Sequence, residues 1–160
     1  MKQSIKEHPG AKGSMVIKIY RGDKLLSTEK IDNLIVNGGK NALANLLGSN
    51  GTGKNISAVG IGDGNAVATA TDTGLTNAVT VTLDETRIAT GLEAEDGSTF
   101  DAANIVQFHF TFPKATAVGL EVKEYGLFCS DGTMFSRIVR GASFIKTDID
   151  SIRGFWQIQF

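Results

Sequence analysis

The chain has 160 residues, of which 41% are hydrophobic, and a formal net charge of −1. This length suffices for one domain with its own core, and the balanced charge argues against a nucleic-acid partner. The lone Cys129 excludes an internal disulfide, and no apolar run approaches the roughly 18 residues of a membrane span. Residues 1–14 are polar and carry no apolar signal segment, so we expect synthesis in the cytoplasm and no membrane partner.

An alternating segment follows this polar start. Hydrophobic residues recur at every second position of MVIKIY (residues 15–20), which predicts a strand. Residues 21–24 (RGDK) favour a tight turn, after which residues 24–36 return as extended chain. We therefore expect a polar N-terminal arm over residues 1–14 and a single β-sandwich domain over residues 15–160.

One segment has helical character. NGGKNALANLL predicts a short helix over about residues 38–47, with Asn37 as its N-cap and Gly48 closing it in the left-handed conformation. A helix this short is marginal alone, so its apolar face is expected to cover a sheet. That face contains four residues at helical spacing: Ala42, Leu43, Leu46 and Leu47.

A glycine-rich segment follows, with Gly60, Gly62 and Gly64 at alternate positions. A phosphate-binding loop needs a helix directly after its glycines, because the helix N-terminus supplies the N–H donors. Residues 65–75 are instead rich in Ala and Thr without a helical apolar face, so we predict no nucleotide site and no cofactor. We interpret four glycines as turn or loop residues: Gly48, Gly62, Gly64 and Gly132.

The sequence of the second half of the chain predicts mainly strands. Residues 105–112 (IVQFHFTF) alternate strictly, Asp131–Gly132 is a hairpin turn between apolar runs, and the chain ends in another alternating segment. The connections are hairpin-like, which indicates a mainly β fold: an antiparallel β-sandwich with one short covering helix. The core positions expected in these strands are Val106, Phe108, Phe110, Phe112, Trp156, Ile158 and Phe160.

The chain offers few groups for catalysis or metal binding. His8 lies in the polar arm, His109 lies on the polar face of its strand, and Cys129 is expected to be a small apolar residue. A zinc site needs three or four ligands, and we predict no catalytic or metal residues. The acidic residues favour a solvated loop, with cation binding as the alternative: Glu93, Glu95, Asp96 and Asp101.

Seven segments of the chain together form a recognisable ordered pattern: Asn33–Val36, Leu46–Leu47, Ile61–Gly64, Asp72–Leu75, Glu124–Phe128, Met134–Val139 and the final strand with its tryptophan. In this order they resemble small virion structural proteins of tailed bacteriophages, of the tail-fibre, tail-collar or baseplate-associated type. The resemblance covers roughly residues 30–160 and includes the motif residues Glu124, Gly126, Leu127 and Phe128.

This resemblance implies a non-enzymatic protein located in the virion. Its expected partners are further copies of itself, in a ring or trimer, and other virion proteins, with host-surface glycans contacted only indirectly. A head-fibre base or capsid-decoration protein is a close alternative. A stand-alone carbohydrate-binding β-sandwich is a second alternative, and an enzyme is a third.

Overall fold

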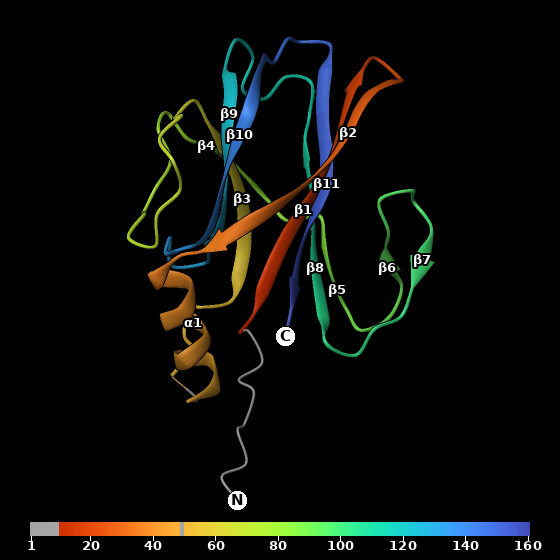
Figure 1. Cartoon of the computed structure of the whole chain (residues 1–160). Coiled ribbons are helices and arrows are strands. Elements are labelled where there is room, and N and C mark those ends of the chain that lie inside the picture. Colours follow the sequence, from red (N-terminus) through yellow and green to blue (C-terminus); the bar gives the residue numbers. More distant parts are fainter. Residues whose placement is uncertain (1–9, 49) are drawn as a thin grey trace, which may run out of the picture.

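The computed structural model describes residues 10–48 and 50–160. Within that part of the chain the structure is mainly β, with a single short helix, α1 (Asn37–Leu47) (Figure 1). The strands are β1 (Lys12–Arg21), β2 (Lys24–Ile35), β3 (Ile56–Gly62), β4 (Val79–Thr82), β5 (Glu85–Ile88), β6 (Leu92–Glu93), β7 (Thr99–Phe100), β8 (Ile105–Phe112), β9 (Glu121–Cys129), β10 (Met134–Ile145) and β11 (Asp150–Gln159).

Nine of these strands form one antiparallel sheet in the order β4-β3-β9-β10-β2-β1-β11-β8-β5. This sheet curls into two layers, which are joined by β2 at one place and by the β4–β5 segment at another. β2 pairs with β1 over residues 24–33 and with β10 at Leu34 and Ile35. β4 and β5 follow each other closely in the chain, yet β4 pairs with β3 and β5 pairs with β8. The fold prediction of a mainly β, antiparallel structure with one short helix is confirmed.

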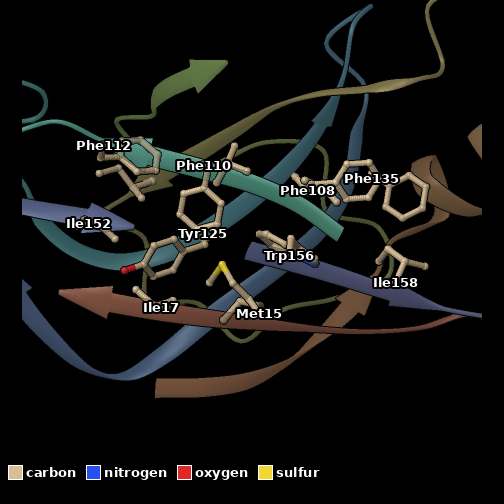
Figure 2. Close-up of a cluster of buried hydrophobic side chains, with 14 of the residues drawn as sticks. Met15, Ile17, Phe108, Phe110, Phe112, Tyr125, Phe135, Ile152, Trp156 and Ile158 are labelled. Atoms are coloured by element: carbon tan, nitrogen blue, oxygen red, sulfur yellow. The ribbon is translucent and has the colours of Figure 1, made fainter. Parts of the chain in front are cut away.

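The hydrophobic core fills the space between the two layers (Figure 2). Phe108, Phe110 and Phe112 of β8 are buried as predicted, and so are Trp156 and Ile158 of β11. Two further predicted core residues, Leu43 and Val106, are half-buried and pack against this cluster. The period-two pattern therefore identified the inward face of both strands.

Three predicted core residues are exposed: Leu46 by 44%, Leu47 by 88% and Phe160 by 62%. For the two leucines, the reason is that α1 meets the sheet through its first turns. A Cβ on Gly38 would lie 2.7 Å from the Met134 carbonyl oxygen, and one on Gly39 would overlap the Phe135 carbonyl. Phe160 follows the last residue of β11, beyond the paired part of the strand.

The ends of α1 also differ from the prediction. Val36, not Asn37, is the N-cap, and no side chain caps the helix. The Asn37 N–H instead donates a hydrogen bond to the Ala70 carbonyl at 2.7 Å. Gly48 has φ −81°, which is not left-handed, whereas Gly132 has φ 85° and is the turn glycine that was predicted.

The first strand begins earlier than predicted. Lys12, Gly13 and Ser14 were assigned to the polar arm, but they belong to β1 and pair with Gln159, Ile158 and Gln157 of β11. Residues 1–9 of the arm lie outside the described residues, and so does the expectation for His8.

Candidate functional site: a buried ion cluster behind a long loop

Four of the segments that carry the resemblance lie next to one another in the structure: Ile61–Gly64, Asp72–Leu75, Glu124–Phe128 and Met134–Val139. β9 is the central element, because β3 pairs along one of its edges and β10 along the other. Gly62 is opposite Glu124 in the first pairing, and Arg137 is opposite Gly126 in the second. Pairing therefore places Arg137 beside Glu124, and Asp72 of the long loop after β3 bonds to Arg137.

Glu124 and Arg137 form a buried ion pair. Arg137 Nε and Nη2 lie 2.8 and 2.7 Å from Glu124 Oε2, and the two residues are 6% and 0% exposed. Glu124 Oε1 accepts hydrogen bonds from the backbone N–H groups of Gly64, at 3.0 Å, and Thr76, at 2.6 Å. Both oxygens of the carboxylate have partners, which is the condition under which a buried charge is tolerated.

Asp72 completes the cluster from the loop side. Arg137 Nη1 lies 2.7 Å from Asp72 Oδ2, which also accepts the Thr69 N–H at 2.8 Å. Burial by itself would raise the pKa of Asp72, but the hydrogen bonds from Thr69 and Arg137 outweigh burial and lower it. Burial likewise opposes the charge of Arg137, whose pKa is nevertheless raised by its bonds to Asp72 and Glu124.

The three charged side chains hold the loop of residues 63–78 against the sheet. We call Asp72, Glu124 and Arg137 the loop clamp. Its hydrogen bonds reach the loop at Gly64, Thr69 and Thr76. The hydrogen bonds of the clamp join its members to one another, to loop N–H groups and to the Thr69 hydroxyl, so its chemistry is that of a structural anchor.

Gly62 and Gly64 leave space for the Glu124 carboxylate of the loop clamp and are not turn glycines. Neither has a positive φ, which corrects the interpretation of both as glycines needed for unusual backbone angles. A Cβ on Gly62 would lie 2.6 Å from Glu124 Oε1 and 2.5 Å from the Thr76 carbonyl oxygen, and one on Gly64 would lie 2.5 Å from Glu124 Oε1. The glycines are required because the carboxylate occupies the space where a side chain would be.

Gly62→Ala is therefore expected to lower the free energy of unfolding by about 1–3 kcal/mol, the range for overpacking a filled site. Gly74→Ala is the matched control, because a Cβ at Gly74 meets nothing within 4 Å and its φ is not positive. Urea denaturation of both variants measures the difference. Equal midpoints for the two variants would contradict the close approach at Gly62.

The other residues of the resemblance motif also have a packing role. A Cβ on Gly126 would lie 2.8 Å from the Phe128 ring, and one on Gly60 would lie 2.9 Å from it. Leu75 lies beside both glycines, 3.2 and 3.1 Å from these Cβ positions. The Phe128 ring thus lies against Gly60 and Gly126, which are paired across β3 and β9, while Leu127 belongs to the core and is fully buried.

His109 lies in a second polar region, on the outer face of β8. The polar face predicted for this strand is covered and not open to solvent at this point, since Gln107 is 0% exposed and His109 is 8% exposed. The β6–β7 hairpin covers it: Gln107 accepts the Glu93 N–H and donates to the Glu93 carbonyl, both at 2.8 Å. Next to them is an open cavity of about 220 Å³, with Lys18, His109 and Arg153 in its wall.

The stability of the protein should depend on the protonation of His109. Burial lowers the pKa of His109, and the charge of Arg87 lowers it further, whereas Glu85, Glu93 and Asp84 oppose this shift without cancelling it. The unfolded chain then binds a proton first, near pH 6.5, so acidification stabilises the unfolded state. We expect the free energy of unfolding to fall as the pH drops from about 7.5 to about 5.5.

His109→Gln should remove this part of the pH dependence, because glutamine does not titrate. The measurement is the urea midpoint of both proteins at several pH values in that interval. Parallel curves for the two proteins would show that His109 titrates alike in the folded and unfolded states.

The remaining candidate residues have local partners. Glu93 pairs with Lys18 at 3.0 Å, Asp96 accepts the Ser98 N–H, and Asp101 accepts the Gly91 N–H. Cys129 is 2% exposed, and burial raises the pKa of its thiol to about 11. Among residues 10–48 and 50–160, no group of three or more His, Cys, Asp or Glu side chains is placed to hold a metal ion. The same residues contain no helix long and apolar enough to cross a membrane.

Asp72 and Arg137 both lie in segments that carry the resemblance, but the sequence alone indicated no role for either residue. A signal was present: Glu124 directly precedes the apolar run YGLFC, and Arg137 lies within the mainly apolar segment MFSRIV. No protein-family model, no curated protein and no solved structure matches the chain.

Proposed function

We propose that the protein is a non-enzymatic structural component of a tailed-bacteriophage particle, located at the tail, collar, baseplate or fibre attachment region. One observation carries this proposal. Four of the seven segments that resemble such proteins meet in the loop clamp, where Glu124 bonds to Arg137 and to the N–H of Gly64, and Arg137 bonds to Asp72. These four segments therefore act as one physical unit.

An exposed apolar surface supports a role in assembly. Five large hydrophobic residues are each about half exposed or more, and they lie in the β1–β2 hairpin, the β8–β9 loop and the β10–β11 region. These segments meet at one end of the sandwich: the Gly22 N–H bonds to the Ile149 carbonyl, and the Gly119 N–H bonds to the Lys146 carbonyl (Figure 1). Large apolar residues exposed together at one end of a molecule favour contacts with other proteins. The residues are Leu25, Leu26, Val118, Ile145 and Ile149.

The decisive experiment is to purify phage particles from cells that carry the gene and to search them for this chain by mass spectrometry. An antibody against the folded protein, imaged on negatively stained particles, would then distinguish a tail position from a head position. We expect stoichiometric amounts of the chain in particles, with the label at the tail or its junction. Absence from purified particles would refute the proposal, and glycan binding by an isolated monomer would favour the carbohydrate-binding alternative.

A further inference from the structure

The chain contains two Asn–Gly dipeptides, Asn37–Gly38 and Asn50–Gly51. In such a dipeptide the backbone nitrogen of the glycine can attack the amide carbon of the asparagine side chain, because glycine has no side chain to hinder the approach. Both asparagines are exposed, so water reaches each of them. The backbone around the two dipeptides differs, and this difference decides which of them can react.

The backbone of Asn37–Gly38 is fixed. The two residues form the first turn of α1, and the Asn37 N–H donates to the Ala70 carbonyl at 2.7 Å. Gly38 lies against β10, since a Cβ there would be 2.7 Å from the Met134 carbonyl oxygen. Ring closure requires rotation of the bond between the asparagine Cα and its carbonyl carbon. That rotation would displace Gly38 from β10 and break the first helical turn.

The backbone of Asn50–Gly51 has no such constraint. Both residues lie between α1 and β3, outside any helix or strand. The Asn50 N–H donates to the Asn45 carbonyl and the Gly51 carbonyl accepts the Lys54 N–H, both at 2.9 Å. Neither bond involves the peptide group that joins the two residues, and the Gly51 N–H has no hydrogen-bond partner among the described residues. The Asn50 side chain makes one long surface bond, from Nδ2 to Asn45 Oδ1 at 3.4 Å.

We propose that Asn50 is a site of spontaneous deamidation and that α1 protects Asn37 from the same reaction. The Gly51 nitrogen bonds to Cγ of Asn50 and loses its proton, the Cγ–Nδ2 bond breaks, and ammonia leaves with that proton. Water then opens the succinimide ring at one of its two carbonyl carbons, which gives aspartate or isoaspartate at position 50. The reaction consumes water, releases ammonia and transfers no electrons. This inference is independent of the proposed virion role.

The product changes the C-terminal end of α1. The Asn50 N–H bonds to the Asn45 carbonyl, one of the last carbonyl groups of the helix, which have no partner within it. A carboxylate at position 50 lies near the negative end of the helix dipole, where it is unfavourable. The last turn carries no basic residue that would offset this charge. Because α1 meets the sheet through its first turns, we expect its last turn to loosen while the sandwich stays folded.

The first test incubates the full chain at neutral and mildly alkaline pH and maps its peptides by mass spectrometry over time. Replacement of the amide by an acid raises the peptide mass, and electron-based fragmentation separates aspartate from isoaspartate. We expect Asn50 to react at least about tenfold faster than Asn37, since reaction at Asn37 first requires local opening of the helix. Comparable rates at the two sites, or no reaction at Asn50, would overturn the inference.

The same measurement in concentrated urea tests whether the fold is the cause. Both dipeptides are free of their structural neighbours in the unfolded chain, so their rates should converge. A difference of about tenfold that persists in urea would show that the flanking sequence protects Asn37 and would overturn the role given to α1.

Two matched variants assign the modification to one residue. Asn50→Gln should abolish the acidic species that forms on incubation and that anion-exchange chromatography resolves, because the longer glutamine side chain cyclises far more slowly. Asn37→Gln should leave that species unchanged, and its side chain makes no capping bond that the substitution would remove. An acidic species that persists in Asn50→Gln would place the reaction elsewhere and overturn the proposal.

Hydrogen exchange tests the consequence for α1. Asn50→Asp carries the charge of the product, and the Gly48 N–H, which bonds to the Ala44 carbonyl at 3.0 Å, reports on the last turn. We expect Gly48 to exchange faster in Asn50→Asp than in Asn65→Asp, which adds the same charge at an exposed position of the long loop. Equal Gly48 exchange rates in the two variants would overturn the effect assigned to the product.

Discussion

Arg137→Met is expected to lower the free energy of unfolding by about 3–5 kcal/mol, the range for removing one partner of a buried ion pair. The substitution keeps much of the side-chain volume but leaves the fully buried Glu124 carboxylate without its cation. It also removes the bond to Asp72, which connects the clamp to the long loop. Chemical denaturation monitored by the fluorescence of Trp156 measures the loss.

Two further proteins make this prediction specific to the buried charge. In Glu124→Gln/Arg137→Met the neutral amide still accepts the N–H groups of Gly64 and Thr76 but needs no cation. We therefore expect the double variant to be more stable than Arg137→Met alone. Arg87→Met, which breaks an exposed pair with Glu85, should leave the midpoint within error. A double variant less stable than Arg137→Met would contradict the role given to the Glu124 charge.

Hydrogen exchange gives a local measure of the same anchor. The amides of Gly64 and Thr76 donate to Glu124 in the folded protein. In Arg137→Met the exchange rates of these two amides should rise, relative to the unsubstituted protein, more than the exchange rates of the β11 amides, because β11 pairs on the other side of the molecule.

Trp156→Ala is expected to cost about 3–5 kcal/mol, the range for large-to-small changes in a packed core. Trp156 is fully buried, pairs across the sheet with Met15 of β1 and Phe108 of β8, and is the largest fully buried side chain (Figure 2). Its removal leaves a cavity between the two layers that the surrounding aromatic residues cannot close without leaving their rotamers.

Two aromatic controls test whether volume is the cause. Trp156→Phe should cost less than about 2 kcal/mol, because it keeps most of the ring and removes an indole N–H that has no hydrogen-bond partner. Phe160→Ala removes an aromatic ring that is 62% exposed, so it should change stability by less than about 0.5 kcal/mol. A Trp156→Ala midpoint equal to that of Phe160→Ala would contradict a stabilising role for Trp156 in the core.

The sequence predicted the strands of this protein well, because a sheet imposes a side-chain period of two on the chain. Residues 105–112 show the pattern, and Phe108, Phe110 and Phe112 are buried together as that period requires. The hairpin turn at Asp131–Gly132 could be predicted equally well, since a positive φ at this position favours glycine. The pattern failed for Leu46, Leu47 and Phe160, because periodicity gives the direction of a side chain and not the extent of the surface it faces.

The candidate site could be predicted only in part. The motif that contains Glu124 was visible as a pattern, but its partners were not, because Arg137 and Asp72 reach it through the order of strands in the sheet and the path of a loop. By itself the sequence determined local conformation: which segments are extended, where turns occur and which side chains share a face. Only the tertiary structure decided that Gly62 and Gly64 make room for a carboxylate and that β2 and β10 diverge, because both depend on groups that are distant in the chain and adjacent in space.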